Sequence, residues 1–126
     1  MLGSADLIAF VPTRDPAKAR QFYEETLGLD FISEDRFALV FNAHGTTLRI
    51  ANVSEVKGFN PAPFTIVGWQ VTNAGDTAGD LVKKGVQFER FPGMDQDAKG
   101  IWKSPSGAKV AWFKDPDGNI LSITQA

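Results

Sequence analysis

The chain has 126 residues, of which 43% are hydrophobic and 22% charged, and its net charge is -2. This length suits one domain with a sizeable core, and the faintly acidic balance provides no basic stripe for a nucleic acid. The absence of cysteine excludes disulfides, thiolate catalysis and cysteine-ligated zinc. Residues 1–12 show no signal peptide, and no apolar run approaches the roughly 20 residues of a membrane span. We therefore expect a soluble, cytoplasmic protein with no nucleic-acid or membrane partner.

The first half of the chain predicts a strand, a helix and three further strands. The helix begins at the pair Asp15-Pro16, an N-cap acceptor followed by proline at the first helical position, and it ends at Gly28. Ala43-His44-Gly45 predicts the turn before the last strand. The strands are expected at 6–11, where Pro12 ends the run, and at 29–33, 36–42 and 46–52.

After a polar, proline-containing linker at 53–63, the second half predicts much the same order. A strand at 64–72 precedes a helix at 76–84, which Gly85 closes, and a strand at 86–91. A long loop at 93–107 has room for a short strand at 100–103. The chain then forms a hairpin of strands 109–114 and 119–125 across the turn Asp115-Pro116-Asp117-Gly118.

The two halves also match each other in sequence. Residues 8–10 match 66–68, and residues 45–50 match 118–123. The identity is weak, but several elements align in the same order, which indicates an internal repeat. We predict a single α+β domain with module one at about 5–53 and module two at about 63–126.

Two sequence motifs carry a resemblance to a known family. Asp15 is followed by Phe22-Tyr23 and Leu27-Gly28-Leu29, and the C-terminal run 113–121 reads Phe-Lys-Asp-Pro-Asp-Gly-Asn-Ile-Leu. With these motifs the chain resembles the glyoxalase, bleomycin-resistance and extradiol-dioxygenase (vicinal oxygen chelate) superfamily over nearly its whole length. The resemblance implies two βαβββ modules whose strands curl into an open cup of mixed sheet.

The same resemblance locates four positions at which metal-dependent members hold their metal ligands. In this chain they are Ile8, Arg49, Ile66 and Ser122. Two aliphatic side chains cannot bind a metal, an arginine is always cationic, and a catalytic zinc or iron site needs about three imidazole, thiolate or carboxylate ligands. We therefore predict no metal and no cofactor in the cup.

Arg49 is the first candidate for a ligand-binding residue. Strand alternation places it opposite Leu48 and Ile50, so it faces the cup if those two pack under the helix. A guanidinium in an apolar cup would bind a carboxylate through two hydrogen bonds. The alternative is a solvated arginine, or one paired with an acidic neighbour.

The other candidates are apolar or weakly polar groups expected to line the same cup. Plain core packing is the alternative for the strand residues, and a dimer contact is the alternative for Trp102, which lies in the long loop. Gly68 leaves room for a ligand or marks a bulge. These candidates are Ile8, Phe10, Ile66, Gln70, Trp102 and Ser122.

No catalytic residue can be assigned from the sequence. His44 is interpreted as an exposed turn residue, and Glu34, Asp35, Asp95 and Asp97 as solvated loop carboxylates. The leading hypothesis is a homodimeric, metal-free protein that binds a small, possibly anionic molecule. One alternative is a metal-independent isomerase or lyase that orients a small anionic substrate with Arg49, Gln70 and Ser122. Another is a domain kept for interaction rather than chemistry.

Overall fold

The computed structural model describes residues 1–126, which divide into two compact units, Met1–Asn60 and Pro61–Ala126. Their union in a single domain stays a prediction. No helix in either unit is long and apolar enough to cross a membrane.

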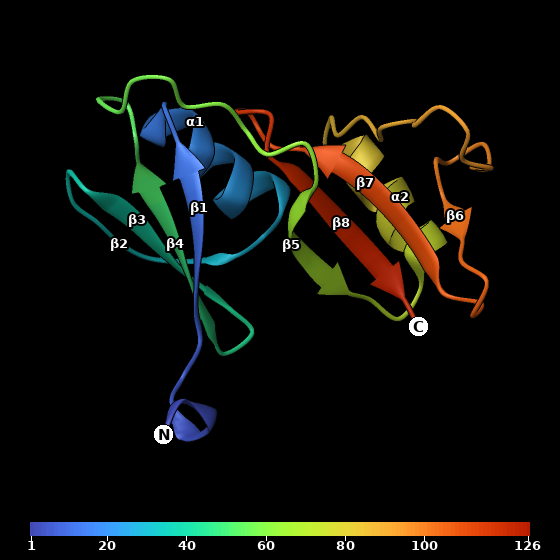
Figure 1. Ribbon diagram of the computed structural model, residues 1–126, viewed down its shortest axis with the longest axis horizontal. Coiled ribbons are helices and arrows are strands. Elements are labelled where there is room, and N and C mark those ends of the chain that lie inside the picture. The colour runs from blue at the N-terminus through green and yellow to red at the C-terminus, as the bar shows by residue number, and fades with distance from the viewer. The chain divides into compact units, whose positions relative to one another are not determined.

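The first unit is a four-stranded sheet with helical turns against one face (Figure 1). Its strand order is β1-β4-β3-β2, with β1 parallel to β4 and the other pairs antiparallel. The predicted end of β1 is wrong by two residues, since the strand continues through Pro12 as the outer strand of its sheet, where proline is tolerated. The elements are η1 Leu2–Ser4, β1 Ile8–Thr13, α1 Pro16–Gln21, η2 Phe22–Thr26, β2 Asp30–Glu34, β3 Ala38–Ala43 and β4 Thr46–Asn52.

Local sequence explains the ends of these elements. The Asp15 carboxylate accepts a hydrogen bond from the backbone N–H of Lys18 at 3.2 Å, which caps α1 as predicted. The π-helical turn η2 continues α1 and brings Tyr23 into the core. Between β3 and β4, His44 and Gly45 both have positive φ, at 51° and 91°, which matches the twist that a tight hairpin needs.

The second unit repeats the plan, with sheet order β5-β8-β7-β6. Strands β5 and β8 are parallel, and β7 is antiparallel to both β8 and β6. The Asn73 side chain caps α2 by accepting from the N–H of Asp76 at 2.9 Å. The elements are β5 Thr65–Gln70, α2 Ala74–Lys83, β6 Trp102–Lys103, β7 Lys109–Lys114 and β8 Ile120–Gln125.

The strand predicted at 86–91 is wrong. This segment makes only an isolated bridge, from Phe88 to Phe113, and the Glu89 N–H donates to the Trp112 carbonyl at 2.8 Å. Backbone groups that a neighbouring strand would have bonded are taken by the Gln96 side chain. Its Oε1 accepts from the Phe91 N–H at 2.8 Å, and its Nε2 donates to the Glu89 carbonyl at 2.9 Å. The fourth strand is instead the short β6, within the range predicted for it.

Each unit therefore has the order strand, helix, three strands, and the predicted α+β class with two βαβββ modules is confirmed. In each unit the main helix covers one face of the sheet, and most of the large buried side chains of the strands lie on that face. The opposite face of each sheet carries Arg49 in the first unit and Trp112 in the second.

Candidate ligand-binding faces of the two sheets

The sheet of the first unit turns one face toward α1 and the other away from it. Leu48 and Ile50 are fully buried on the α1 side, so Arg49 between them lies on the other side, as strand alternation predicts. We call this other side the first open face and define it by Ile8, Phe10, Val40 and Arg49.

Arg49 lies in the middle of the first open face. It is flanked by Phe10 on β1 and by Val40 on β3. Ile8 and Phe10 are 53% and 57% exposed, which is high for apolar side chains of a strand. The structure thus brings together three predicted residues, Ile8, Phe10 and Arg49, as an apolar surface with one cation.

Asp35 supplies a carboxylate near that cation. The pKa of Asp35 is held below its ordinary value of 3.8, mainly by hydrogen bonds from the backbone N–H groups of Phe37 and Ala38, and further by the positive charges of Arg49 and Arg36. The positive charge of Arg49 therefore favours the ionised form of this carboxylate. This arrangement agrees with the alternative of an acidic neighbour, and Asp35 could not be chosen from the sequence.

The sheet of the second unit also has a face turned away from its helix. Gly68 on β5, Ser122 on β8 and Trp112 on β7 lie in one row across this sheet. Trp102 pairs with Val110, two residues before Trp112, and therefore lies on the same side. We call this side the second open face and define it by Gly68, Trp102, Trp112 and Ser122, with Phe91 at its margin.

The sequence suggested that Gly68 leaves room for a ligand, but the structure shows that the space beside it is occupied. A Cβ at this position would lie 2.6 Å from the Ser122 Oγ, so the missing side chain makes space for that hydroxyl. Ser122 is only 7% exposed. The sequence offered a bulge as the other interpretation of Gly68. The irregularity lies just before this residue, since the register of β5 on β8 shifts between Thr65 and Val67.

Aromatic rings form the accessible part of the second open face. The Trp112 ring lies 5.5 Å from Phe91 in an edge-to-face contact and 6.1 Å from Trp102. All three side chains keep partial exposure. Sequence reasoning selected Trp102 but missed Phe91 and Trp112. The hairpin register across residues 115–118 places Trp112 opposite Ser122, and that signal could have found it.

Ile66 and Gln70 are less well defined as site residues. Ile66 stands within the register shift of β5, so strand alternation does not fix its direction. Gln70 is exposed at the end of β5, in register with Thr124. Of the predicted set, the second unit holds Ile66, Gln70, Trp102 and Ser122. Trp102 is one of the three rings, Ser122 is opposite Trp112, and Gln70, two residues after Gly68, lies on the same face.

The side chains present do not fit a catalytic transition metal. Ile8 and Ile66 have no donor atom and Arg49 is cationic. No group of three or more His, Cys, Asp or Glu side chains lies close enough to bind one ion.

The remaining polar candidates have local structural roles. His44 is exposed in the β3–β4 turn. The Asp97 Oδ1 accepts from the backbone N–H groups of Lys99 and Ile101 at 2.8 and 2.9 Å and so shapes its loop. Glu34 lies 3.7 Å from Arg20 in an exposed ion pair.

Comparison with known proteins agrees with this architecture. The profile of the Glyoxalase/Bleomycin resistance protein/Dioxygenase superfamily matches residues 5–123. No curated protein matches the chain.

Three solved structures illustrate the similarity. A member of the glyoxalase/bleomycin resistance protein/dioxygenase superfamily from Sphaerobacter thermophilus DSM 20745 shares 20% identity with a TM-score of 0.75, over 100% of both chains. TnmS3, an antibiotic binding protein from Streptomyces sp. CB03234, shares 24% identity with a TM-score of 0.72, over 99% of this chain and 98% of its own. A bleomycin resistance determinant encoded on the transposon Tn5 shares 19% identity with a TM-score of 0.72, over 97% and 98%. At these identities the likeness shows the fold alone.

Proposed function

Because the chain belongs to the Glyoxalase/Bleomycin resistance protein/Dioxygenase superfamily, we propose that it is a binding protein for a small, flat, largely apolar molecule, which stacks on the second open face. The observation that carries this proposal is the cluster of Phe91, Trp102 and Trp112, whose rings touch one another yet remain partly exposed. Exposed aromatic rings grouped beside small residues offer a flat molecule both apolar area and favourable ring contacts.

Two relatives support a binding role. TnmS3 is described as an antibiotic binding protein and the Tn5 protein as a bleomycin resistance determinant. In this chain the second open face has apolar rings and one buried hydroxyl, which suits a ligand held mainly by stacking. The alternative of a metal-independent isomerase or lyase gains no support, because Ser122 is buried beside Gly68 and His44 is exposed in a turn.

We further propose that the first open face favours an anionic group, with Arg49 as its cation. Its apolar neighbours Ile8 and Phe10 would contact the body of such a ligand. Asp35 moderates this preference, since a ligand carboxylate has to compete with it for the guanidinium. The absence of a metal from the working protein is part of the same proposal.

Phenazine, a flat uncharged tricycle, is the probe for the second open face. We expect it to quench tryptophan fluorescence and raise the unfolding temperature, because a ligand at about 100 times its Kd adds about 2.7 kcal/mol of stability. Trp112→Leu and Trp102→Leu should each weaken binding by roughly 3- to 10-fold, the equivalent of one lost ring contact. Phe64→Leu is the matched control, since Phe64 is an exposed aromatic side chain that is not among the residues of the second open face.

Two results would contradict the proposal. One is an affinity for phenazine that is the same in Trp112→Leu, Trp102→Leu and the control. The other is a loss of binding only in variants whose unligated unfolding temperature has also collapsed, which would mean that the rings serve the fold.

We also propose a homodimer. Leu7 is an exposed apolar residue next to β1, the outer strand of its sheet, and pairing along this edge would cover it. Sedimentation at micromolar concentration should show a dimer for the parent chain. A monomer under these conditions would reject the proposal.

A further inference from the structure

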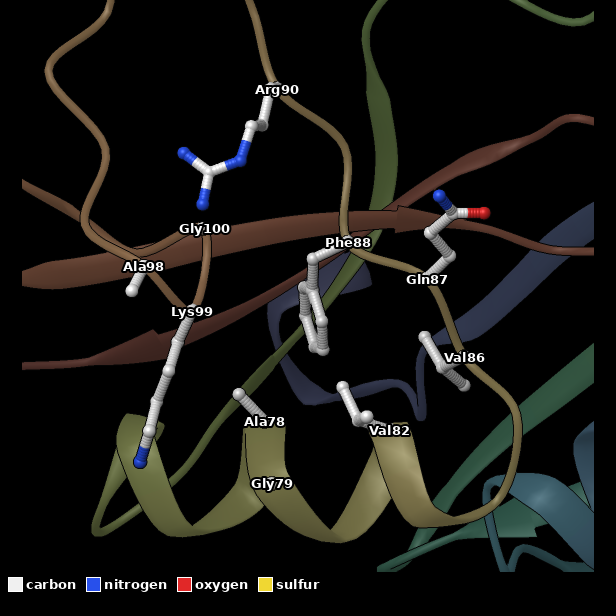
Figure 2. Close-up of a pocket in the computed structure, with 10 residues that line it drawn as sticks. All are labelled: Ala78, Gly79, Val82, Val86, Gln87, Phe88, Arg90, Ala98, Lys99 and Gly100. Atoms are coloured by element: carbon white, nitrogen blue, oxygen red, sulfur yellow. The ribbon is translucent and has the colours of Figure 1, made fainter.

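The second unit has a pocket on the helix side of its sheet, away from the second open face. It has a volume of about 440 Å³ and lies between α2 and the segment 86–100. Figure 2 shows Ala78 and Val82 rising from α2 toward the Phe88 ring, with Val86 at one end. This volume is within the range of small-molecule sites.

The pocket exists because residues 86–91 do not join the sheet. Phe88 is held by an edge-to-face contact with Phe113, whose ring centre is 5.6 Å away, and by the single bridge to the same residue. Between Phe88 and α2 the walls are apolar. Val82 remains 56% exposed there, although it belongs to the main helix of the unit. The protein's own packing therefore leaves this apolar surface uncovered.

The charged residues that line the pocket are both cations, Arg90 and Lys99. The Arg90 Nη2 donates to the Asp97 carbonyl at 2.6 Å and its Nη1 to the Gln96 carbonyl at 3.4 Å. The Lys99 Nζ donates to the Gly75 carbonyl at 3.4 Å. Carbonyl groups fix the direction of these side chains without cancelling their charge, and no acidic side chain lines the pocket. Lys99 also borders a neighbouring groove that contains Asp76 and Asp80, so Arg90 is the stronger anion anchor.

Gly79 widens the pocket at the helix. A Cβ at this position would have no atom within 4 Å, so the protein's own packing does not require glycine there. Glycine in the interior of a helix is unfavourable compared with alanine. The missing side chain keeps the wall of the pocket open, where a ligand can lie against the helix backbone.

We propose that this pocket binds an amphipathic carboxylate, a molecule with an aliphatic body and a single terminal negative charge. Its body would lie against Ala78, Val82 and Phe88, and its carboxylate would bind the guanidinium of Arg90. The apolar walls account for the body, and the excess of cations at the margin accounts for the sign of the charge. The residues of this site belong to neither open face, and the proposal does not depend on the function proposed for those faces.

Decanoate is the probe, with decanol as its uncharged analogue, and affinities are followed by NMR of the methyl groups of Val82 and Val86. Decanoate should bind at least 10-fold more tightly than decanol and shift these methyl signals. The decisive quantity is the ratio of the two affinities within each variant, because this ratio is insensitive to a general loss of folded protein. Arg90→Met should bring the ratio close to one. The matched control is Lys83→Met, which removes a cation of α2 that does not line the pocket. It should leave the ratio unchanged.

A second variant tests the location. Gly79→Leu fills the wall of the pocket and should weaken both probes at least 10-fold, whereas Trp112→Leu on the second open face should change neither. The proposal is overturned by a parent ratio near one, by equal ratios in Arg90→Met and Lys83→Met, or by unchanged decanoate binding in Gly79→Leu.

Discussion

The two units place different side chains at the same positions of the same fold. The row Phe10, Arg49 and Val40 of the first sheet corresponds to the row Gly68, Ser122 and Trp112 of the second. In the first unit the central residue is a long cation beside an exposed ring. In the second unit the central residue is Ser122, with a small buried hydroxyl. The aromatic ring beside it, Trp112, lies on β7, on the other side of the central strand. One backbone plan thus provides a charged face in one unit and an aromatic face in the other.

The units differ in the segment that follows the helix as well. In the first, residues 30–34 form β2 and complete the ladder next to β3. In the second, residues 86–91 stay outside the ladder because the Gln96 side chain bonds their backbone groups. The difference gives the second unit a pocket behind its sheet, and the first unit has a regular strand at the matching place.

The largest expected effect tests whether the two units unfold together. Phe41 and Phe113 are buried at equivalent places, each opposite a buried leucine across its hairpin. Replacing either with alanine should cost about 3–5 kcal/mol of unfolding free energy. All three tryptophans lie in the second unit, so tryptophan fluorescence reports its unfolding alone. If the chain is one cooperative domain, Phe41→Ala will shift the fluorescence transition in urea as far as Phe113→Ala does.

Far-UV circular dichroism is the companion measurement, because it reports both units. For a single domain the two transitions coincide in each variant. A fluorescence transition that stays in place in Phe41→Ala, while circular dichroism reveals an earlier step, would show that the units unfold independently.

The next effect sharpens the contrast between the central residues of the two open faces. Gly68→Ala places a Cβ against the Ser122 Oγ, and we expect a loss of about 1–3 kcal/mol, as for other overpacked sites. In a Ser122→Ala background the obstructing hydroxyl is absent, so the same change should cost clearly less. Gly79→Ala is the control, since its Cβ meets nothing and helix propensity favours alanine by about 1 kcal/mol. Equal costs in both backgrounds would mean that Gly68 is needed for its backbone and not for space.

A smaller effect concerns the charge on the first open face. Arg49 is partly exposed, so Arg49→Met should weaken binding of 2-naphthoate by only about 1 kcal/mol, and that of uncharged 2-naphthamide not at all. Asp35→Asn keeps an oxygen for the N–H groups of Phe37 and Ala38 but removes the competing charge, so it should raise the affinity for naphthoate. Titration calorimetry measures all of these affinities. If Asp35→Asn weakens naphthoate binding, Arg49 and Asp35 form a structural pair and the anionic-ligand hypothesis fails.

Sequence reasoning succeeded where local chemistry decides the structure. Three features follow from residues within a few positions of one another. They are the cap at Asp15-Pro16, the turn at His44-Gly45 and the hairpin from 109 to 125. The direction of Arg49 followed from alternation because both of its neighbours are buried.

The failures depend on contacts between distant or irregular segments. The segment 86–91 has the apolar pattern of a strand, but a glutamine five residues beyond its end replaces the partner strand. Asp35 lies outside the strand that carries Arg49, so no local pattern in the sequence relates the two charges. Predicting the pocket against α2 would require knowing which part of the helix residues 86–100 leave uncovered. No periodicity in the sequence gives this information.

The smallest expected effect compares the turns before the third and seventh strands at acid pH. The Asp35 carboxylate accepts from the N–H groups of Phe37 and Ala38 at 2.8 and 3.0 Å, whereas in the second unit a Ser104 hydroxyl accepts from the Ala108 N–H at 3.0 Å. Only the first turn contains a titrating acceptor.

Because the folded pKa of Asp35 lies below the ordinary 3.8, the ionised carboxylate stabilises the folded state above about pH 4, and this contribution is lost as the pH falls through the folded pKa. Carbon-13 NMR of the Asp35 carboxyl should show a midpoint below 3.8. In Arg49→Met the midpoint should rise but stay below 3.8, since the backbone hydrogen bonds are the larger cause. A midpoint that reaches 3.8 in this variant would show that Arg49, and not the turn, holds the carboxylate ionised, and Arg49 would then be committed to Asp35 before any ligand arrives.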